Sequence, residues 1–430
     1  MSLAADDHKY LWHPFTQQQG WVEEEPVIIE SAQGTTLVDT DGKTYIDGVS
    51  SLWCNVHGHR HPAIDAAVAD QLQKVSHSTM LGLSHRPAIE LAKRLIEIAP
   101  AGLTRVFYSD SGSTATEIAL KMAFQYWRQS AGEGERRAKF VSLKEAYHGD
   151  TIGSVSAGGI DLFHSTYRPL LFDTLKAEPG DAADMEQILA ANEGEVAAVI
   201  LEPLVQGAAG MLMHPPGYLA AVRRLCDRYG VLLICDEVAT GFGRTGTMFA
   251  CQHEQVAPDL MCVAKGITGG YMPLAATFAT ERIYEGFLGR HEDYRTFFHG
   301  HTYTGNPLAC AAAIATLDVF AEEDTIVRLQ PKIELLERLL APIAGLPYVG
   351  EIRQRGFMVG IELEGFEPAA RMGHRITLEA RRRGAIIRPL GDVIVLMPPL
   401  SIEGPELERL VSITRQSIEA ATAASLPLAA

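Results

Sequence analysis

Two side chains of complementary chemistry follow two short apolar stretches of this sequence. Asp236 comes directly after the apolar run 231–235, and Lys265 comes directly after the apolar run 260–264. Apolar runs of this length predict buried strands. The carboxyl ends of parallel strands lie at one edge of a sheet, where such sheets bind their ligands. The spacing therefore predicts a carboxylate and an amine beside one site.

This pair suits the cofactor pyridoxal phosphate. A lysine in such enzymes forms a Schiff base with the cofactor aldehyde, and an aspartate pairs with the ring nitrogen. A buried ammonium is costly unless it is paired, so buried lysines tend to shift their pKa or to react. On the residues alone, Lys265 could equally be a strand-end lysine that reaches solvent from a loop.

Two further segments carry groups that a phosphorylated, planar ligand would need. Residues 109–114 join a predicted strand to a predicted helix, and Gly112 lets the backbone approach a ligand at the helix start, which favours phosphate. An ordinary serine or threonine N-cap explains the same residues. Tyr147 follows the predicted strand 139–143, where its ring could stack on a cofactor or lie in a loop without a ligand.

A metal site is not expected. Asp236 and Glu237 could form a metal pair or an acid/base couple, and histidines recur at positions 57, 59, 61, 299 and 301. No carboxylate or cysteine completes a plausible ligand set near these histidines in the sequence.

The composition excludes several classes of partner. The 430 residues carry a formal net charge of -16, which argues against nucleic acid and anionic membranes. The six cysteines form no C-x-x-C pair, so a reducing, cytoplasmic location is expected. No signal peptide is visible, and no apolar run is long enough to span a bilayer.

The order of the predicted elements indicates an α/β fold. Helices and apolar strands alternate from about residue 60 to 320, which predicts a mostly parallel sheet covered by helices. The pattern then changes to a smaller α+β unit. We expect an N-terminal segment, 1–60, that packs with the small domain, a large domain over 61–320, and a small C-terminal domain over 321–430.

Taken together, these segments resemble the class III, fold type I pyridoxal phosphate aminotransferases over nearly the whole chain. This family has a seven-stranded type of sheet in its large domain. The motifs lie at 11–14, 47–53, 57–58, 109–113, 122–127, 147–151, 236–246, 265–270, 305–310, 388–389 and 397–399. Within the family they are most similar to the biotin-pathway branch, which aminates 8-amino-7-oxononanoate to 7,8-diaminononanoate.

The resemblance implies a role for each matching residue around the cofactor. Lys265 would form the Schiff base and carry protons, Asp236 would pair with the ring nitrogen, and Tyr147 would stack on the ring. The other implied cofactor contacts are Gly112 and Ser113 at the phosphate, Gln206 at the phenolic oxygen, Val238 behind the ring, and His301 and Thr302 at the phosphate of the other subunit. The last two imply a homodimer with shared active sites.

The resemblance also implies a substrate pocket. Arg388 would bind the substrate carboxylate, for which a bidentate guanidinium is well suited. Arg244 would shape the donor side, and the remaining implied substrate positions are Phe15, Leu52, Trp53 and Gly300.

Two substrate positions depart from the common family pattern. Phe15 stands where the family has tyrosine, and Leu52 stands where it has the first of two tryptophans. With these two residues the sequence resembles a branch of the family in which lysine rather than S-adenosylmethionine can be the amino donor. Either compound is therefore a candidate donor.

Three other functions remain as alternatives. They are a broad ω-amino acid or amine–pyruvate transaminase, an aminomutase that uses the same cofactor, and an inactive cofactor-binding protein. Intact Asp236, Lys265 and Arg388 argue against the last of these.

Overall fold

The computed structural model describes residues 2–130 and 136–423. Its largest sheet has seven strands in the order β4-β12-β11-β10-β7-β5-β6. The strands are β4 (Leu103–Ser109), β5 (Lys139–Leu143), β6 (Leu175–Ala177), β7 (Val196–Leu201), β10 (Leu232–Asp236), β11 (Leu260–Val263) and β12 (Ala275–Thr280). The pairs among β11, β10, β7, β5 and β6 are parallel. The expected α/β fold with a mostly parallel seven-stranded sheet is confirmed.

The sequence pattern explains why these strands are central. Every residue of β7, β10 and β11 is buried, as expected for parallel strands that helices cover on both faces. The exception to parallel pairing is β12, which runs antiparallel to both β11 and β4. Its small and alternating residues gave no clear strand signal in the sequence.

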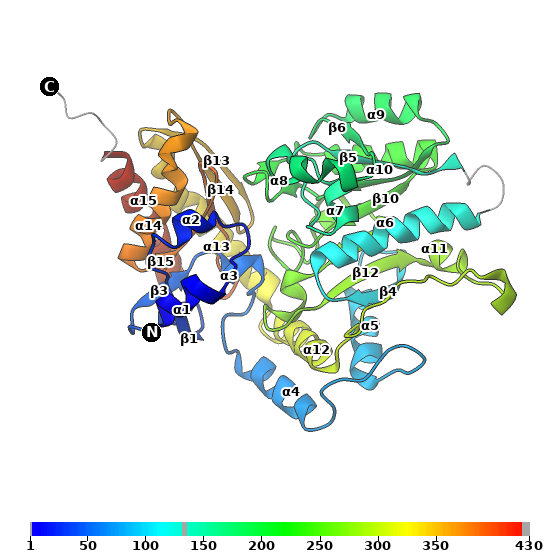
Figure 1. The fold of residues 1–430 in the computed structure, drawn as a ribbon, viewed down its shortest axis with the longest axis horizontal. Coiled ribbons are helices and arrows are strands. Elements are labelled where there is room, and N and C mark those ends of the chain that lie inside the picture. Colours follow the sequence, from blue (N-terminus) through cyan, green and yellow to red (C-terminus); the bar gives the residue numbers. More distant parts are fainter. Residues whose placement is uncertain (1, 131–135, 424–430) are drawn as a thin grey trace.

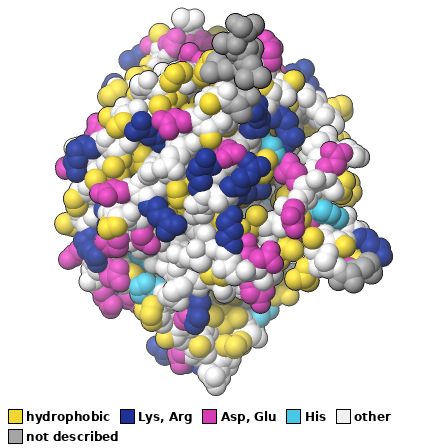
Figure 2. Space-filling view, turned by 90° about the vertical axis from the view of Figure 1, so that its left-hand side faces the viewer, with side chains coloured by type: hydrophobic (Ala, Val, Ile, Leu, Met, Phe, Trp, Pro, Cys, Tyr) yellow, Lys and Arg dark blue, Asp and Glu magenta, His cyan; other side chains and the backbone are white. Residues whose placement is uncertain are grey.

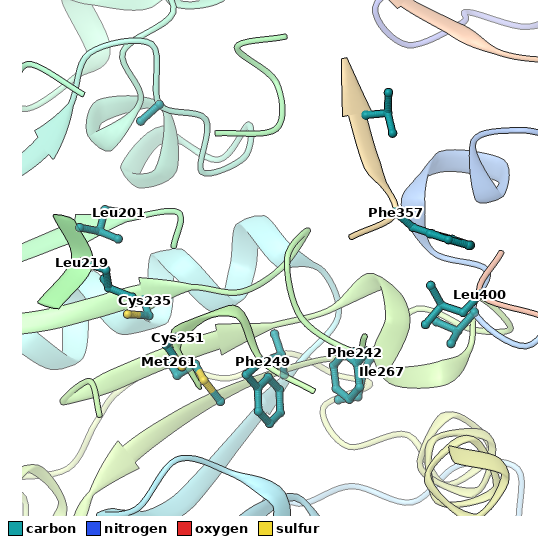
Figure 3. Packing of buried hydrophobic residues seen from close by; sticks show 14 of the residues in the cluster. Leu201, Leu219, Cys235, Phe242, Phe249, Cys251, Met261, Ile267, Phe357 and Leu400 are labelled. Carbon is teal, nitrogen blue, oxygen red and sulfur yellow. The ribbon is translucent and has the colours of Figure 1, made fainter. Parts of the chain in front are cut away.

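Helices cover the sheet on both sides (Figure 1). The longer ones in this part of the chain are α4 (Pro62–Leu72), α5 (Arg86–Ile98), α6 (Gly112–Gln129), α9 (Ala182–Ala191), α10 (Tyr218–Tyr229) and α12 (Pro307–Glu322). Helix α6 packs against β11 and β12. Buried side chains such as Cys235, Met261 and Phe249 form a continuous apolar layer beside the strands (Figure 3).

The two terminal regions of the chain share a sheet. Strands β1 (Ile29–Gln33), β2 (Thr36–Asp39) and β3 (Thr44–Asp47) form a meander, and β15 (Ala385–Ile386) pairs with β3 in parallel. The blue and orange-red ribbons accordingly lie together in Figure 1.

A second C-terminal sheet, β13-β14-β17-β16, completes this unit. Its strands are β13 (Val349–Arg355), β14 (Met358–Leu363), β16 (Arg388–Leu390) and β17 (Val393–Leu396), and the adjoining helices are α13 (Thr325–Leu340), α14 (Met372–Arg383) and α15 (Gly404–Ala423). The domain boundaries at 60 and 320 stay predictions, and the last seven residues of the expected C-terminal domain lie outside the described ones.

The surface of the terminal unit carries interspersed basic and acidic side chains (Figure 2). Helix α14, for example, ends in three arginines, two of which pair with Glu379. Among the described residues, no helix has the length and apolar content needed to cross a membrane.

Candidate active site

A cavity of about 870 Å³ opens at the carboxyl ends of the parallel strands. Loops that follow β4, β5, β10 and β11 form most of its wall, as the position of ligand sites in such sheets predicts. Eight predicted site residues line it, namely Leu52, Trp53, Gly112, Ser113, Tyr147, Asp236, Val238 and Lys265. The sequence thus predicted the centre of this cavity from its strand ends and motifs.

The register of two strands places Asp236 and Lys265 beside each other. Asp236 ends β10 and is paired with Cys262 of β11, so Lys265 follows three residues beyond the partner position. Lys265 has a left-handed backbone, with φ of 46°, which is uncommon for a residue other than glycine. Its Nζ lies 4.7 Å from the centroid of the Trp53 ring.

Burial is the main influence on the pKa of Lys265. Loss of hydration lowers the pKa of Lys265 from its ordinary value, and the negative charges of Asp236 and Glu202 offset part of that effect. A lowered pKa leaves more of the amine neutral at neutral pH, which is the form that reacts with carbonyl groups and accepts protons.

Asp236 is held by a buried histidine that the sequence did not single out. The Asp236 Oδ2 lies 2.7 Å from Nδ1 of His148, and Asp236 Oδ1 accepts the N–H of Val238 at 3.1 Å. Both side chains are buried, and the opposite ring nitrogen of His148 has no hydrogen-bond partner in the described part of the chain. These contacts orient a carboxylate at the bottom of the cavity.

The start of α6 contributes backbone N–H groups to the cavity wall. Ser111 caps the helix, and Gly112 and Ser113 form its first turn, where N–H groups lack helical partners. A side chain at Gly112 would place its Cβ 2.5 Å from Cγ1 of Val238, so any other residue here would have to displace Val238. The Ser113 hydroxyl lies 3.0 Å from that of Thr151. This geometry suits an anion.

Tyr147 connects the cavity with the N-terminal segment. Its hydroxyl donates to Asp150 at 2.8 Å, and burial raises its pKa far above the usual range. The Tyr147 ring makes an edge contact with Phe163, and Phe163 makes another with Phe15, with centroids 6.3 and 5.4 Å apart.

Phe15 and Arg388 lie outside the main cavity. They line a neighbouring cavity of about 250 Å³ together with Trp21, Glu24 and Arg371. Burial lowers the pKa of Arg388, and the Tyr147 hydroxyl acts electrostatically in the opposite direction. The aromatic contacts through Phe163 place this second cavity beside the first.

Two predicted contacts, Gln206 and Arg244, line neither cavity, and both form hydrogen bonds inside the chain. Gln206 donates to the Lys144 carbonyl at 2.9 Å and lies 3.0 Å from His214. Arg244 donates to the carbonyls of Asn55 and Pro398 at 2.6 and 2.7 Å, and burial lowers its pKa to about 10. Within one chain, both are structural contacts behind the wall.

The segment that carries Gly300, His301 and Thr302 also lies outside the cavity wall. His301 Nδ1 is 2.9 Å from Asp110, which does line the cavity, and Thr302 is exposed. No cluster of three or more metal-ligating side chains occurs among the residues that the structure describes.

Glu202 is another wall residue for which the sequence predicted no role. It directly follows β7, and its buried carboxylate lines the cavity. Burial raises the pKa of Glu202 to about 7, and the charge of Asp236 adds to the rise. The available signal was the same as for Asp236, since Glu202 follows a fully apolar strand.

Comparison with known proteins defines the class. The family model of the class-III aminotransferases matches residues 18–418. The chain belongs to this family and is an aminotransferase.

Individual members of this family are similar to the chain over nearly its whole length. The chain is 59% identical to the adenosylmethionine-8-amino-7-oxononanoate aminotransferase of Nitratidesulfovibrio vulgaris, over 98% of this chain and 82% of that protein. The crystal structure of the enzyme of that name from Methanocaldococcus jannaschii has a TM-score of 0.95 at 44% identity and covers 97% of this chain and 98% of its own. A PLP-bound amine transaminase from an uncultivated Pseudomonas species has a TM-score of 0.90 at 36% identity, with 96% and 98% covered.

Proposed function

We propose that this protein aminates 8-amino-7-oxononanoate to 7,8-diaminononanoate with pyridoxal phosphate as cofactor. The observation that carries the proposal is the placement of Lys265 and Asp236 at one cavity in a chain whose relatives bear that activity in their names. Diaminononanoate formation is a step of biotin biosynthesis, so the proposed role is biosynthetic.

The residues around the cavity fit the cofactor. Lys265 offers an amine to its aldehyde, Asp236 offers a buried carboxylate to its ring nitrogen, and Gly112 and Ser113 offer N–H groups to its phosphate. Tyr147 and Val238 would enclose the ring. Bound there, the cofactor would supply an electron-accepting ring conjugated to the carbon that carries the transferred nitrogen.

Two side chains, Asp236 and Lys265, would then hold and transfer the protons of the reaction. Asp236, oriented by His148, would keep a proton on the ring nitrogen. Lys265 would remove a proton from the donor carbon and return one to the acceptor carbon, and its lowered pKa favours the neutral amine that this needs. Trp53 beside Lys265 would limit the access of water to these transfers.

Arg388 is the proposed partner of the substrate carboxylate. It is half-buried in the cavity beside Tyr147, where a guanidinium can bind a carboxylate in a bidentate manner. Phe15 lines the same cavity and offers an apolar surface to a methylene chain. The amino donor is S-adenosylmethionine or lysine, and Phe15 and Leu52 are the residues that would discriminate between them.

A product assay tests the function. Cofactor-loaded protein would be incubated with 8-amino-7-oxononanoate and either donor, and 7,8-diaminononanoate would be measured by mass spectrometry. We expect the diamine with at least one of the two. Amination of pyruvate by simple amines without any diamine would instead support the second candidate, a broad amine transaminase, which the similarity to the Pseudomonas enzyme favours.

We also infer a homodimer with shared active sites. Leu81, Leu83, Phe298 and Tyr303 are large apolar residues that are more than half exposed in the single chain. The two segments that carry them lie together, since the rings of His77 and Tyr303 are 4.8 Å apart. An exposed apolar surface of this kind favours a protein partner. The same segment carries His301 and Thr302, whose predicted role is at the partner's cofactor.

A further inference from the structure

The cavity wall holds four carboxyl side chains, and three of them have a polar side-chain partner. Asp236 contacts His148, Asp110 contacts His301, and Asp150 accepts the hydroxyl of Tyr147. Glu202 is the fourth. Among the described residues, its hydrogen-bond donors are the backbone N–H groups of Tyr147, at 3.2 Å, and Gly207, at 3.0 Å.

Within residues 2–130 and 136–423, the Glu202 carboxylate forms no ion pair and so has no resident cation. The ionisable groups that face it are His148 and Tyr147 after β5, Asp236 at the end of β10, and Lys265 after β11. A buried, unpaired carboxylate on a cavity wall is costly to maintain, so it indicates a function for the charge.

We propose that Glu202 binds the 8-ammonium group of the acceptor and thereby selects amino ketones over simple ketones. This inference rests on the proposed function. In 8-amino-7-oxononanoate the amine is on the carbon adjacent to the reacting carbonyl. A carbonyl within reach of Lys265 therefore carries its ammonium group to the same part of the wall, where Glu202 faces Lys265 and the other carboxylates already have partners.

The protonation of Glu202 then couples to acceptor binding. Burial holds its pKa near 7, so a proton occupies part of the population at neutral pH. An ammonium group in contact with the carboxylate favours the ionised form and lowers that pKa, so binding releases a proton. Acceptor binding should weaken as the pH falls below about 7, because protonated Glu202 has lost its charge.

The test compares two ketones that differ only in the amine. For Glu202→Gln, kcat/KM with 8-amino-7-oxononanoate should fall about 10- to 100-fold, the range of a lost charge-assisted hydrogen bond. The inhibition constant of 7-oxononanoate, which lacks the amine, should change less than about twofold on the same basis. The first half-reaction with the amino donor is measured in parallel, and the fall with 8-amino-7-oxononanoate should exceed any change in that rate, which would report the effect of Glu202 on Lys265. Glu202→Asp should recover part of the selectivity.

Glu237→Gln is the matched control. Glu237 is equally buried and accepts three hydrogen bonds, from Thr240 and from the N–H groups of Ala250 and Cys251, but it does not line the cavity. Its replacement should leave the ratio between the two ketones unchanged, even if thermal stability falls.

Calorimetry of Lys265→Ala in its pyridoxamine form gives a readout that leaves Glu202 unchanged, since this variant should not turn over. Titration of this form with 8-amino-7-oxononanoate near pH 7, in buffers of different ionisation enthalpy, should show proton release, and 7-oxononanoate should show none. The role of Glu202 is overturned if Glu202→Gln weakens kcat/KM for 8-amino-7-oxononanoate and the binding of 7-oxononanoate by the same factor. It is also overturned if the two ketones release the same number of protons. A wild type that makes no diamine with any donor overturns the proposed function itself, and the role of Glu202 with it.

Discussion

At the residue scale, the hydrogen bond between His148 and Asp236 determines how well the cavity can hold a protonated ring nitrogen. Asp236 is buried, and its one side-chain hydrogen-bond partner among the described residues is His148, at 2.7 Å. A buried carboxylate that loses such a partner is penalised by its full desolvation.

His148→Phe should therefore weaken cofactor binding and lower kcat by about 10- to 100-fold, the equivalent of one hydrogen bond to a charged group. The pH titration of the cofactor's absorbance should also shift, because the proton on the ring nitrogen is held less firmly. His148→Asn can still donate a hydrogen bond and should recover part of both properties. A Phe variant with the titration curve of the wild type would show that His148 has only a packing role.

At the element scale, the site is an assembly of loop and helix starts that follow adjacent strand ends. Helix α6 begins so close to the loop after β10 that Gly112 and Val238 leave no room for another carbon atom. This close approach positions the first turn of α6 at the cavity wall.

Gly112→Ala should lower the affinity for pyridoxal phosphate by about 5- to 150-fold, since overpacking of this kind typically costs about 1–3 kcal/mol. Val238→Ala removes the opposing methyl groups and should restore part of the affinity in the double variant. Fluorescence titration of the apoenzyme measures all four proteins. Additive losses in the double variant would contradict the proposed steric cause.

The elements that could be predicted from the sequence are those with a local apolar pattern. Strands β7, β10 and β11 could be predicted because they are apolar throughout, and Asp236 and Lys265 could be placed because they follow such strands. His148 could not, because its partner is 88 residues away in the chain and no local pattern indicates the contact. The antiparallel β12 and the pairing of β3 with β15 are likewise long-range arrangements without a local signal.

Substrate residues show a similar limit. Phe15 and Arg388 come from opposite ends of the sequence, and only the three-dimensional structure shows that they line one cavity. Resemblance to a family indicated their roles, whereas the residues alone did not.

At the scale of the whole molecule, the exposed apolar side chains near the 297–306 segment support the proposed homodimer. A dimer would cover them and would bring His301 and Thr302 of one chain toward the other. Activity should then depend on association, because each site would be incomplete in the monomer.

Sedimentation should therefore give twice the chain mass of 46.8 kDa. Phe298→Asp should shift the protein toward the monomer and reduce activity in parallel, because a charge replaces an apolar contact. Val327→Asp is the control, since Val327 is similarly exposed, at 69% against 74%, but lies on α13. A fully active monomeric variant would contradict shared active sites.

Identification of the lysine that binds the cofactor tests the account most directly. Borohydride treatment of the cofactor-loaded protein fixes the cofactor to that lysine, and peptide mapping by mass spectrometry locates it. We expect the label on Lys265, no label in Lys265→Ala, and no transamination by that variant. The instructive competitor is Lys176, whose pKa burial lowers to about 8. A label on Lys176 or on any lysine other than Lys265, or turnover by Lys265→Ala at the wild-type rate, would contradict the proposed active site.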